Sequence, residues 1–106
     1  MEQRMEEKFE MIICIANAGF SGEVMDVARR AGVTGGTVVH ARGTASKSAE
    51  ETFQIAINPD KDLIIMAVNA KIKDAVLKSI YDECGFTTNA GAVAFSLPII
   101  SSTGIK

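Results

Sequence analysis

Hydrophobic residues recur along this chain with two different periods, and the two periods alternate. Short apolar runs rich in β-branched residues, bounded by glycine, asparagine or proline, predict strands. Apolar residues at every third or fourth position predict helices, here from about Gly22 to Ala31 and from Asn69 or Ala70 to about Cys84. The predicted strands are 9–16, 35–42, a strand in two parts (52–57 and 63–68) with a turn or bulge at 58–62, and 93–97, closed by Pro98.

Residues at the ends of these segments agree with the predicted bounds. Ser21 can cap the first helix, and Gly32 suits the left-handed position after it. Gly85 ends the second helix. Residues 1–8 are expected to be a loose lead and 99–106 a short tail. The order βαββαβ predicts a ferredoxin-like α+β domain, with a four-stranded antiparallel sheet and both helices on one face.

The predicted sheet is apolar on both faces, although a face that meets water should alternate toward polar residues. Burying one large aliphatic side chain stabilises by roughly 1.5–3 kcal/mol. Leaving about three or four of them in water would forgo on the order of 5–10 kcal/mol, comparable with the whole stability of a small domain. Other copies of the chain are therefore expected to cover the second face. The opposed sets are Phe9, Met11, Ile13 and Ile15 against Ile12, Cys14 and Ala16, and Leu63 and Ile65 against Ile64, Met66 and Val68.

Composition and charge narrow the function classes. The chain has 106 residues, 47% of them hydrophobic and 23% charged, as expected of one globular domain over 1–106. A net charge of −2 without a basic cluster argues against nucleic acid as the main partner. The longest apolar runs, 11–16 and 63–68, are too short to insert across a bilayer, and no export signal is recognised. With Cys14 and Cys84 expected to be reduced core thiols, the sequence predicts a cytoplasmic protein.

Several segments together resemble the nitrogen-regulatory PII family. Residues 32–39 (GVTGGTVV), followed by Arg42-Gly43, are similar to the family's helix-end, glycine and second-strand segment. The resemblance continues through 63–68, the helix after it and 91–95, and covers about residues 9–97. It implies a homotrimer whose sheets line a central cavity, and a small-molecule effector such as an adenine nucleotide in clefts between subunits. It also implies a regulator without enzymatic activity, whose flexible loop reports to a protein target such as a transporter or an enzyme.

The resemblance also implies a ligand site. By position, 43–51 with its flank to about 57 corresponds to the family's T-loop. Residues 86–92 correspond to the B-loop, whose backbone N–H groups would cradle phosphates, and residues 35–37 would meet the base or ribose. The implied ligand-binding residues are Gly35, Gly36, Thr37, Arg42, Gly43, Thr44, Lys47, Thr87, Thr88, Asn89, Ala90, Gly91 and Ala92, among which Arg42 and Lys47 are the cations left at the loop base.

The chain departs from the family at the positions of the family's charged residues. The family has a lysine at the end of the B-loop, where this chain has Gly91-Ala92. The family also has two arginines near the C-terminus, and 99–106 contains none. Asp60 stands where a further lysine is expected. Each charge-assisted hydrogen bond contributes about 1.5–3 kcal/mol. Losing three would cost ~4–8 kcal/mol, or several orders of magnitude in affinity. AMP, ADP, a cyclic nucleotide, a carboxylate or bicarbonate therefore fits better than tightly bound ATP. Uridylylation of a loop tyrosine is not expected, because Tyr81 is the only tyrosine.

Other interpretations of the same residues stay open. Gly35-Gly36 can be a turn that needs positive φ, and 87–91 can be an anion-binding nest of backbone amides or a plain turn. Asp60 and Asp62 are expected to be solvated in a turn. His40, the only histidine, has no carboxylate at short spacing in the sequence, which favours a structural or interface role.

Two other function classes use related architectures. A CutA-like trimeric metal-tolerance protein would need His or Cys ligands near a cleft, and this chain supplies few. An acylphosphatase would need an arginine after the first strand to hold phosphate, and 17–20 (NAGF) has none. The sequence therefore favours a PII-like regulator, with the CutA-like protein as the alternative, and it assigns no catalytic or metal-binding residue.

Overall fold

The computed structural model of the chain describes residues 8–44 and 59–105. Within them the predicted order βαββαβ is confirmed. The predicted strand part 52–57 and most of the predicted loop 43–51, including Lys47, lie outside the described residues. The elements are β1 (Phe9–Asn17), α1 (Ser21–Arg30), β2 (Thr37–Arg42), β3 (Asp60–Asn69), α3 (Ala70–Cys84) and β4 (Val93–Ile99).

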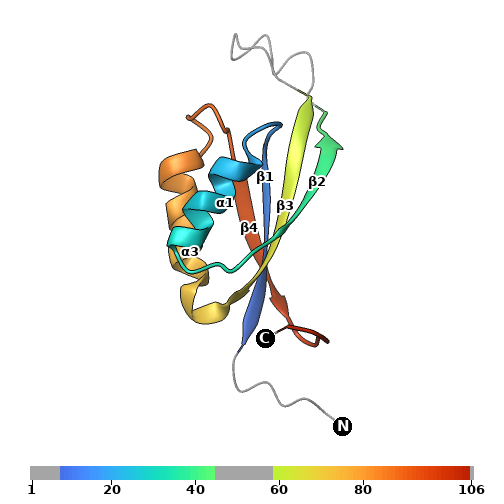
Figure 1. Cartoon of the computed structure of the whole chain (residues 1–106), viewed down its shortest axis with the longest axis vertical. Helices are drawn as coiled ribbons and strands as arrows, with labels where there is room; N and C mark the ends of the chain where they lie inside the picture. Colours follow the sequence, from blue (N-terminus) through green and yellow to red (C-terminus); the bar gives the residue numbers. More distant parts are fainter. Residues whose placement is uncertain (1–7, 45–58, 106) are drawn as a thin grey trace.

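The four strands form one antiparallel sheet in the order β2-β3-β1-β4. Both helices lie on the same side of it (Figure 1), which confirms the ferredoxin-like α+β architecture. β2 and β4 are the edge strands. Because a proline is tolerated at an edge, β4 continues through Pro98, which lies opposite Glu10. The expectation that the last strand ends before Pro98 is therefore wrong.

The side of the sheet that faces the helices holds the core. Alternate residues of the central strands, among them Ile12, Cys14, Ile64 and Met66, are fully buried there. Burial, with a smaller effect from nearby Cys84, raises the pKa of Cys14 to about 12, so its thiol stays protonated. Both cysteines are buried and free, which confirms that they are core thiols.

The other side of the sheet, which we call the open face, is apolar, and the described residues 8–44 and 59–105 do not cover it. Ile15 lies between Leu63 and Val93 across the strands, and Ile13 lies between Ile65 and Phe95. Five of its residues leave 36–51% of their surface exposed, which confirms that the sheet is apolar on both sides. No helix in the described residues is long and apolar enough to span a membrane. The open face consists of Met11, Ile13, Ile15, Val39, Leu63, Ile65, Val93, Phe95 and Leu97.

A buried carboxylate joins β2 and β3 to the turn before α1. The Asp62 side chain is only 2% exposed. Its Oδ1 accepts a hydrogen bond from Nδ1 of His40, the residue opposite in β2, at 2.9 Å, and its Oδ2 accepts the Gly19 N–H at 3.1 Å. The bond from His40 is the main cause that holds the pKa of Asp62 below its usual value, although burial acts in the opposite direction. The expectation that Asp62 is solvated in a turn is therefore wrong, and His40 has a carboxylate partner that sequence spacing did not reveal.

The helix cap that was expected from Ser21 is not formed, and the Asp62 carboxylate lies beside the start of the helix instead. Helix α1 begins at Ser21 itself, and Phe20 occupies the cap position without a side-chain hydrogen bond. A bond from the Ser21 hydroxyl to Asp62 contributes to lowering the pKa of that carboxyl. A negative charge near a helix N-terminus is also favourable for the helix dipole. The predicted Ser21 cap is wrong because the start of α1 is held from β3.

The two glycines before β2 differ in their surroundings. Neither has positive φ, so a turn that needs positive φ is not the reason for this pair, whereas Gly32 has φ +112° as predicted. A Cβ at Gly36 would lie 3.0 Å from Cγ of Met66 and 3.1 Å from the carbonyl oxygen of Ile65. A Cβ at Gly35 would meet nothing within 4 Å. Gly36 therefore allows the chain to pack closely on β3.

Substitution of these glycines by alanine separates the two roles. Gly36→Ala is expected to lower the free energy of unfolding by about 1–3 kcal/mol, because the new methyl group overpacks the contact with Met66. Gly35→Ala is expected to change it by less than about 1 kcal/mol in either direction. Urea denaturation at one fixed protein concentration measures both. Equal losses for the two variants would contradict the close packing of Gly36.

The pH dependence of stability tests the Asp62 network. A carboxyl whose pKa is lowered by folding stabilises the folded state at pH values above its unfolded pKa of about 3.9. This stabilisation is lost as the pH falls through the folded pKa. Asp62→Asn is expected to lower the free energy of unfolding by about 1–3 kcal/mol at neutral pH, and the deficit should shrink below about pH 4. Urea denaturation across this range measures it, with Asp60→Asn, whose side chain is 67% exposed, as the control. A deficit that does not change with pH would argue against an ionised Asp62.

Candidate functional site

One end of the sheet gathers most of the residues predicted to bind a ligand. Here β1 and β2 end and β3 and β4 begin, at the top of Figure 1. Lys61 of β3 lies opposite Asn17 of β1, and the Asn17 N–H donates to the carbonyl oxygen of Ala90 at 2.8 Å. The base of the predicted loop at Gly43 and the turn 86–92 are thus connected through the ends of β3 and β1.

The base of the predicted loop is closed by backbone and charge contacts. The Gly43 N–H donates to the carbonyl oxygen of Pro59 at 2.6 Å. Next to this bond, Arg42 Nη1 lies 3.8 Å from Oδ1 of Asp60, and both side chains are exposed. Thr44 is exposed and ends the first described range. Arg42 is therefore positioned at the loop base, but a carboxylate already faces its charge.

The turn 86–92 has a defined backbone conformation. Three backbone N–H groups donate to backbone carbonyl oxygens: that of Thr88 to Gly85 at 2.9 Å, that of Gly91 to Thr88 at 3.0 Å and that of Ala92 to Cys84 at 2.7 Å. Gly91 has φ +55°, a region that favours glycine. These bonds fix the turn without any contribution from a charged side chain.

Residues of the turn divide into packing and exposed positions. Ala90 and Ala92 are buried, so their side chains belong to the core. Thr87 and Asn89 are exposed. In the part of the chain that the structure describes, no group accepts a hydrogen bond from the N–H of Asn89 or Ala90. These two backbone donors are available to an anion, as a nest of amides would require.

Lys61 is a residue of this site that the sequence interpretation missed. Its Nζ donates to Oδ1 of Asn17 at 2.7 Å, and Nδ2 of Asn17 donates to the carbonyl oxygen of Asn89 at 3.0 Å. A Cβ at Gly43 would lie 3.3 Å from Cγ of Lys61, so the lysine stem lies against the loop base. The side chain therefore connects the loop base with the turn. Extending the alternation of 63–68 by two residues toward the N-terminus would have placed Lys61 on the open face, the same face as Leu63.

Gly35, Gly36 and Thr37 lie apart from this end of the sheet. Thr37 begins β2 opposite Ile65, five residues before Arg42, which is about 17 Å along a strand. β2 and β4 are opposite edges of the sheet, so within one chain these residues do not reach the turn before β4. Residues 35–37 and the turn 86–92, which we call the two halves of the predicted ligand site, thus lie at opposite edges of the sheet.

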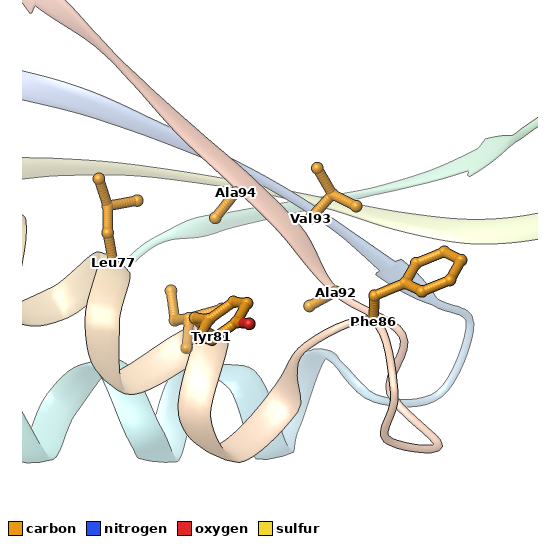
Figure 2. Close-up of a pocket in the computed structure, with 7 residues that line it drawn as sticks. Leu77, Tyr81, Phe86, Ala92, Val93 and Ala94 are labelled. Atoms are coloured by element: carbon orange, nitrogen blue, oxygen red, sulfur yellow. The ribbon is translucent and has the colours of Figure 1, made fainter.

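An apolar groove of about 230 Å³ lies between α3 and β4, next to the turn (Figure 2). Tyr81 from the helix and Phe86 from the turn are 76% and 71% exposed. Helical spacing places Tyr81 with the apolar residues of α3, but its side chain is not buried with them. The groove is lined by Leu77, Ile80, Tyr81, Phe86, Ala92, Val93 and Ala94.

His40 presents one ring nitrogen to solvent. Because an ionised carboxylate only accepts hydrogen bonds, Nδ1 carries the proton in the bond to Asp62 and Nε2 is left without one in the neutral ring. The His40 side chain is 89% exposed. No group of three or more His, Cys, Asp or Glu residues in ranges 8–44 and 59–105 could hold a metal ion.

Comparison with known proteins identifies the fold. No protein-family model and no curated protein matches the sequence, whereas solved structures do. CPII, a nitrogen regulatory PII-like protein from Thiomonas intermedia solved with ADP, AMP and bicarbonate, matches with a TM-score of 0.66 at 21% identity, over 92% of this chain and 97% of that chain. The GlnK–ATP complex from Bacillus subtilis matches with a TM-score of 0.66 at 15% identity, over 87% and 82% of the two chains.

The same fold also occurs within a longer chain. A Bacillus cereus protein related to NIF3 matches with a TM-score of 0.68 at 14% identity, over 90% of this chain but only 26% of that chain. A shared fold does not by itself assign a function. At the level of the fold, the matches agree with the sequence resemblance: the chain is a divergent protein with the fold of the PII-like signalling proteins.

Proposed function

We propose that this protein is a PII-like signal-transduction protein that senses an adenine nucleotide or a related metabolite in clefts between its own copies. The proposal depends on one observation: the two halves of the predicted site lie on opposite edges of a sheet whose open face is apolar. An edge-to-edge contact would bring residues 35–37 of one copy to the turn 86–92 of the next. A head-to-tail contact of this kind closes into a ring when the rotation between copies is a whole fraction of a turn, and closure after three copies makes the trimer that the resemblance implies.

The open face provides a driving force for this assembly. Ile15, Val93, Phe95 and Leu97 each keep 36–51% of their surface exposed in one chain. Fully burying such a side chain contributes about 1.5–3 kcal/mol. Completing the burial of these four contributes on the order of 3–5 kcal/mol per copy. A trimer whose sheets face a common centre would cover the open face with copies of itself.

The nucleotides bound by similar structures support the ligand class. CPII was solved with ADP, AMP and bicarbonate, and GlnK with ATP. In this chain the free N–H groups of Asn89 and Ala90 offer donors to a phosphate. Arg42 faces Asp60, and residues 99–106 contain no arginine. These features favour AMP, ADP or a cyclic nucleotide over tightly bound ATP.

The regulatory output is proposed to pass through the segment that starts at Gly43. Its ends are joined by the bond from Gly43 to Pro59, and the segment between lies outside the described residues. Regulation of a transporter or an enzyme follows from the resemblance, as do the absence of enzymatic activity and the cytoplasmic location. The CutA-like alternative has no observation in its favour.

Assembly through the open face is tested by a charged substitution. The wild-type protein is expected to have three times the chain mass of 11.3 kDa in light scattering. Phe95→Asp is expected to dissociate the trimer, because an aspartate in the buried contact would lose its hydration. Lys71→Glu changes a charge at the exposed start of α3 and should leave the mass unchanged.

Circular dichroism distinguishes a dissociated, folded Phe95→Asp chain from an unfolded one. A wild-type protein that stays a soluble monomer at micromolar concentration would overturn the proposal, because no cleft between copies would then exist.

Ligand binding at the turn is tested by a matched pair of glycine substitutions. In Gly91→Ala, the new Cβ at φ +55° would lie 2.9 Å from Nδ2 of Asn17 and displace the bond that holds the turn. Gly104→Ala has comparable backbone strain at φ +86° with no neighbour within 4 Å. Calorimetry with AMP, ADP, ATP and cyclic AMP is expected to show binding to wild type and about tenfold weaker binding to Gly91→Ala only. Absence of binding to wild type for all four nucleotides would reject the nucleotide ligand.

A further inference from the structure

Lys61 is a positioned cation that no carboxylate of the described residues pairs with. Its Nζ donates to Oδ1 of Asn17, a neutral amide oxygen, at 2.7 Å. At the loop base, by contrast, Arg42 faces Asp60. Within the described residues, no carboxylate forms an ion pair with Lys61.

The neighbouring carboxylate of Asp62 does not neutralise this charge. Successive residues of a strand point to opposite sides of the sheet. Asp62 therefore points to the helix side, where it accepts hydrogen bonds from His40 and Gly19. Lys61 points to the open side, where its nearest polar partner is Asn17.

Two contacts hold the ammonium beside the turn 86–92. The stem of Lys61 lies against the backbone at Gly43. Asn17, whose Oδ1 accepts the hydrogen bond from the ammonium, is itself held in place. Its backbone N–H donates to the carbonyl oxygen of Ala90 at 2.8 Å, and its Nδ2 donates to the carbonyl oxygen of Asn89 at 3.0 Å. A side chain that is already ordered loses less conformational entropy when a ligand binds.

We propose that Lys61 binds the anionic oxygens of the ligand, from a phosphate or a carboxylate, beside the free N–H groups of Asn89 and Ala90. An ammonium has three N–H donors. Asn17 takes one, and two are left for a ligand. The inference rests on the proposed function, which supplies the ligand. It assigns a cation to a site whose turn ends in the uncharged residues Gly91-Ala92.

Titration calorimetry of the full chain with ADP, citrate and adenosine tests this assignment. Lys61→Met keeps most of the stem and removes the charge. It is expected to weaken ADP binding about 10- to 100-fold, because one charge-assisted hydrogen bond is lost, and to leave the affinity for uncharged adenosine unchanged. A parallel loss for citrate assigns Lys61 to carboxylates as well as phosphates, and a loss for ADP alone assigns it to phosphates.

Two further variants control for structural effects. Lys61→Arg keeps the charge and should keep most of the ADP affinity, and Lys71→Met removes an exposed lysine elsewhere and should change nothing. Thermal denaturation confirms that each variant is folded, and Lys61→Gln replaces Lys61→Met if that variant is not.

The outcomes separate this inference from the proposed function. Wild-type affinity for ADP in Lys61→Met overturns the role of Lys61 but leaves the proposed function intact. An equal loss for ADP and adenosine also overturns it, because Lys61 would then act only by supporting the shape of the site. A wild-type protein that binds neither citrate nor any of AMP, ADP, ATP and cyclic AMP rejects the proposed function together with the inference.

Discussion

A four-stranded sheet with both helices on one side can bury only one of its faces, and in this chain both faces are apolar. On the helix side, Ile12, Ile64 and Met66 are buried within the chain. On the open side, the rows through Ile13 and Ile15 have no cover from the chain's described residues. The need to cover this surface links the fold to the proposed function, because the contact that would cover it also joins the halves of the ligand site.

The start of β3 is where this constraint meets the chemistry of the site. Period-2 alternation sends Asp62 to the helix side and Lys61 to the open side. A slip of one residue would exchange them and bury the lysine among apolar side chains, at a high cost in free energy. The bonds that Asp62 makes with His40 and Gly19 oppose such a slip. The buried anion on one face therefore fixes the position of the cation on the other.

Local sequence patterns predicted the fold well because its helices and most strands are strongly periodic. The helix predicted to run from Asn69 or Ala70 to about Cys84 is observed over Ala70–Cys84, and the alternation in β1 assigned each side chain to the correct face. The start of β3 was predicted three residues late, because Asp60, Lys61 and Asp62 look like a solvated turn.

What decides the state of Asp62 is not local in the sequence. Its partners His40 and Gly19 are 22 and 43 residues away, so no window around Asp62 contains them. Lys61 was missed for the same reason, because its partner Asn17 is 44 residues away. The loop base and the turn 86–92, in contrast, were located in advance, because glycines and small polar residues mark them locally.

At identities of 14–21% to similar structures, the shared fold does not assign a function, and the residues of the site have to indicate it. In the family that the sequence resembles, cations at the end of the B-loop and in the C-terminal tail face the phosphates. This chain has no lysine at the end of the turn 86–92 and no arginine in 99–106. Instead it holds one lysine on a strand, connected to the turn through Asn17. Each added phosphate brings further charge that needs its own donors, whereas a single ammonium with two free N–H groups can serve one anionic group. The proposed site would therefore suit a ligand of low charge, and this is the physical reason to propose an effector other than ATP.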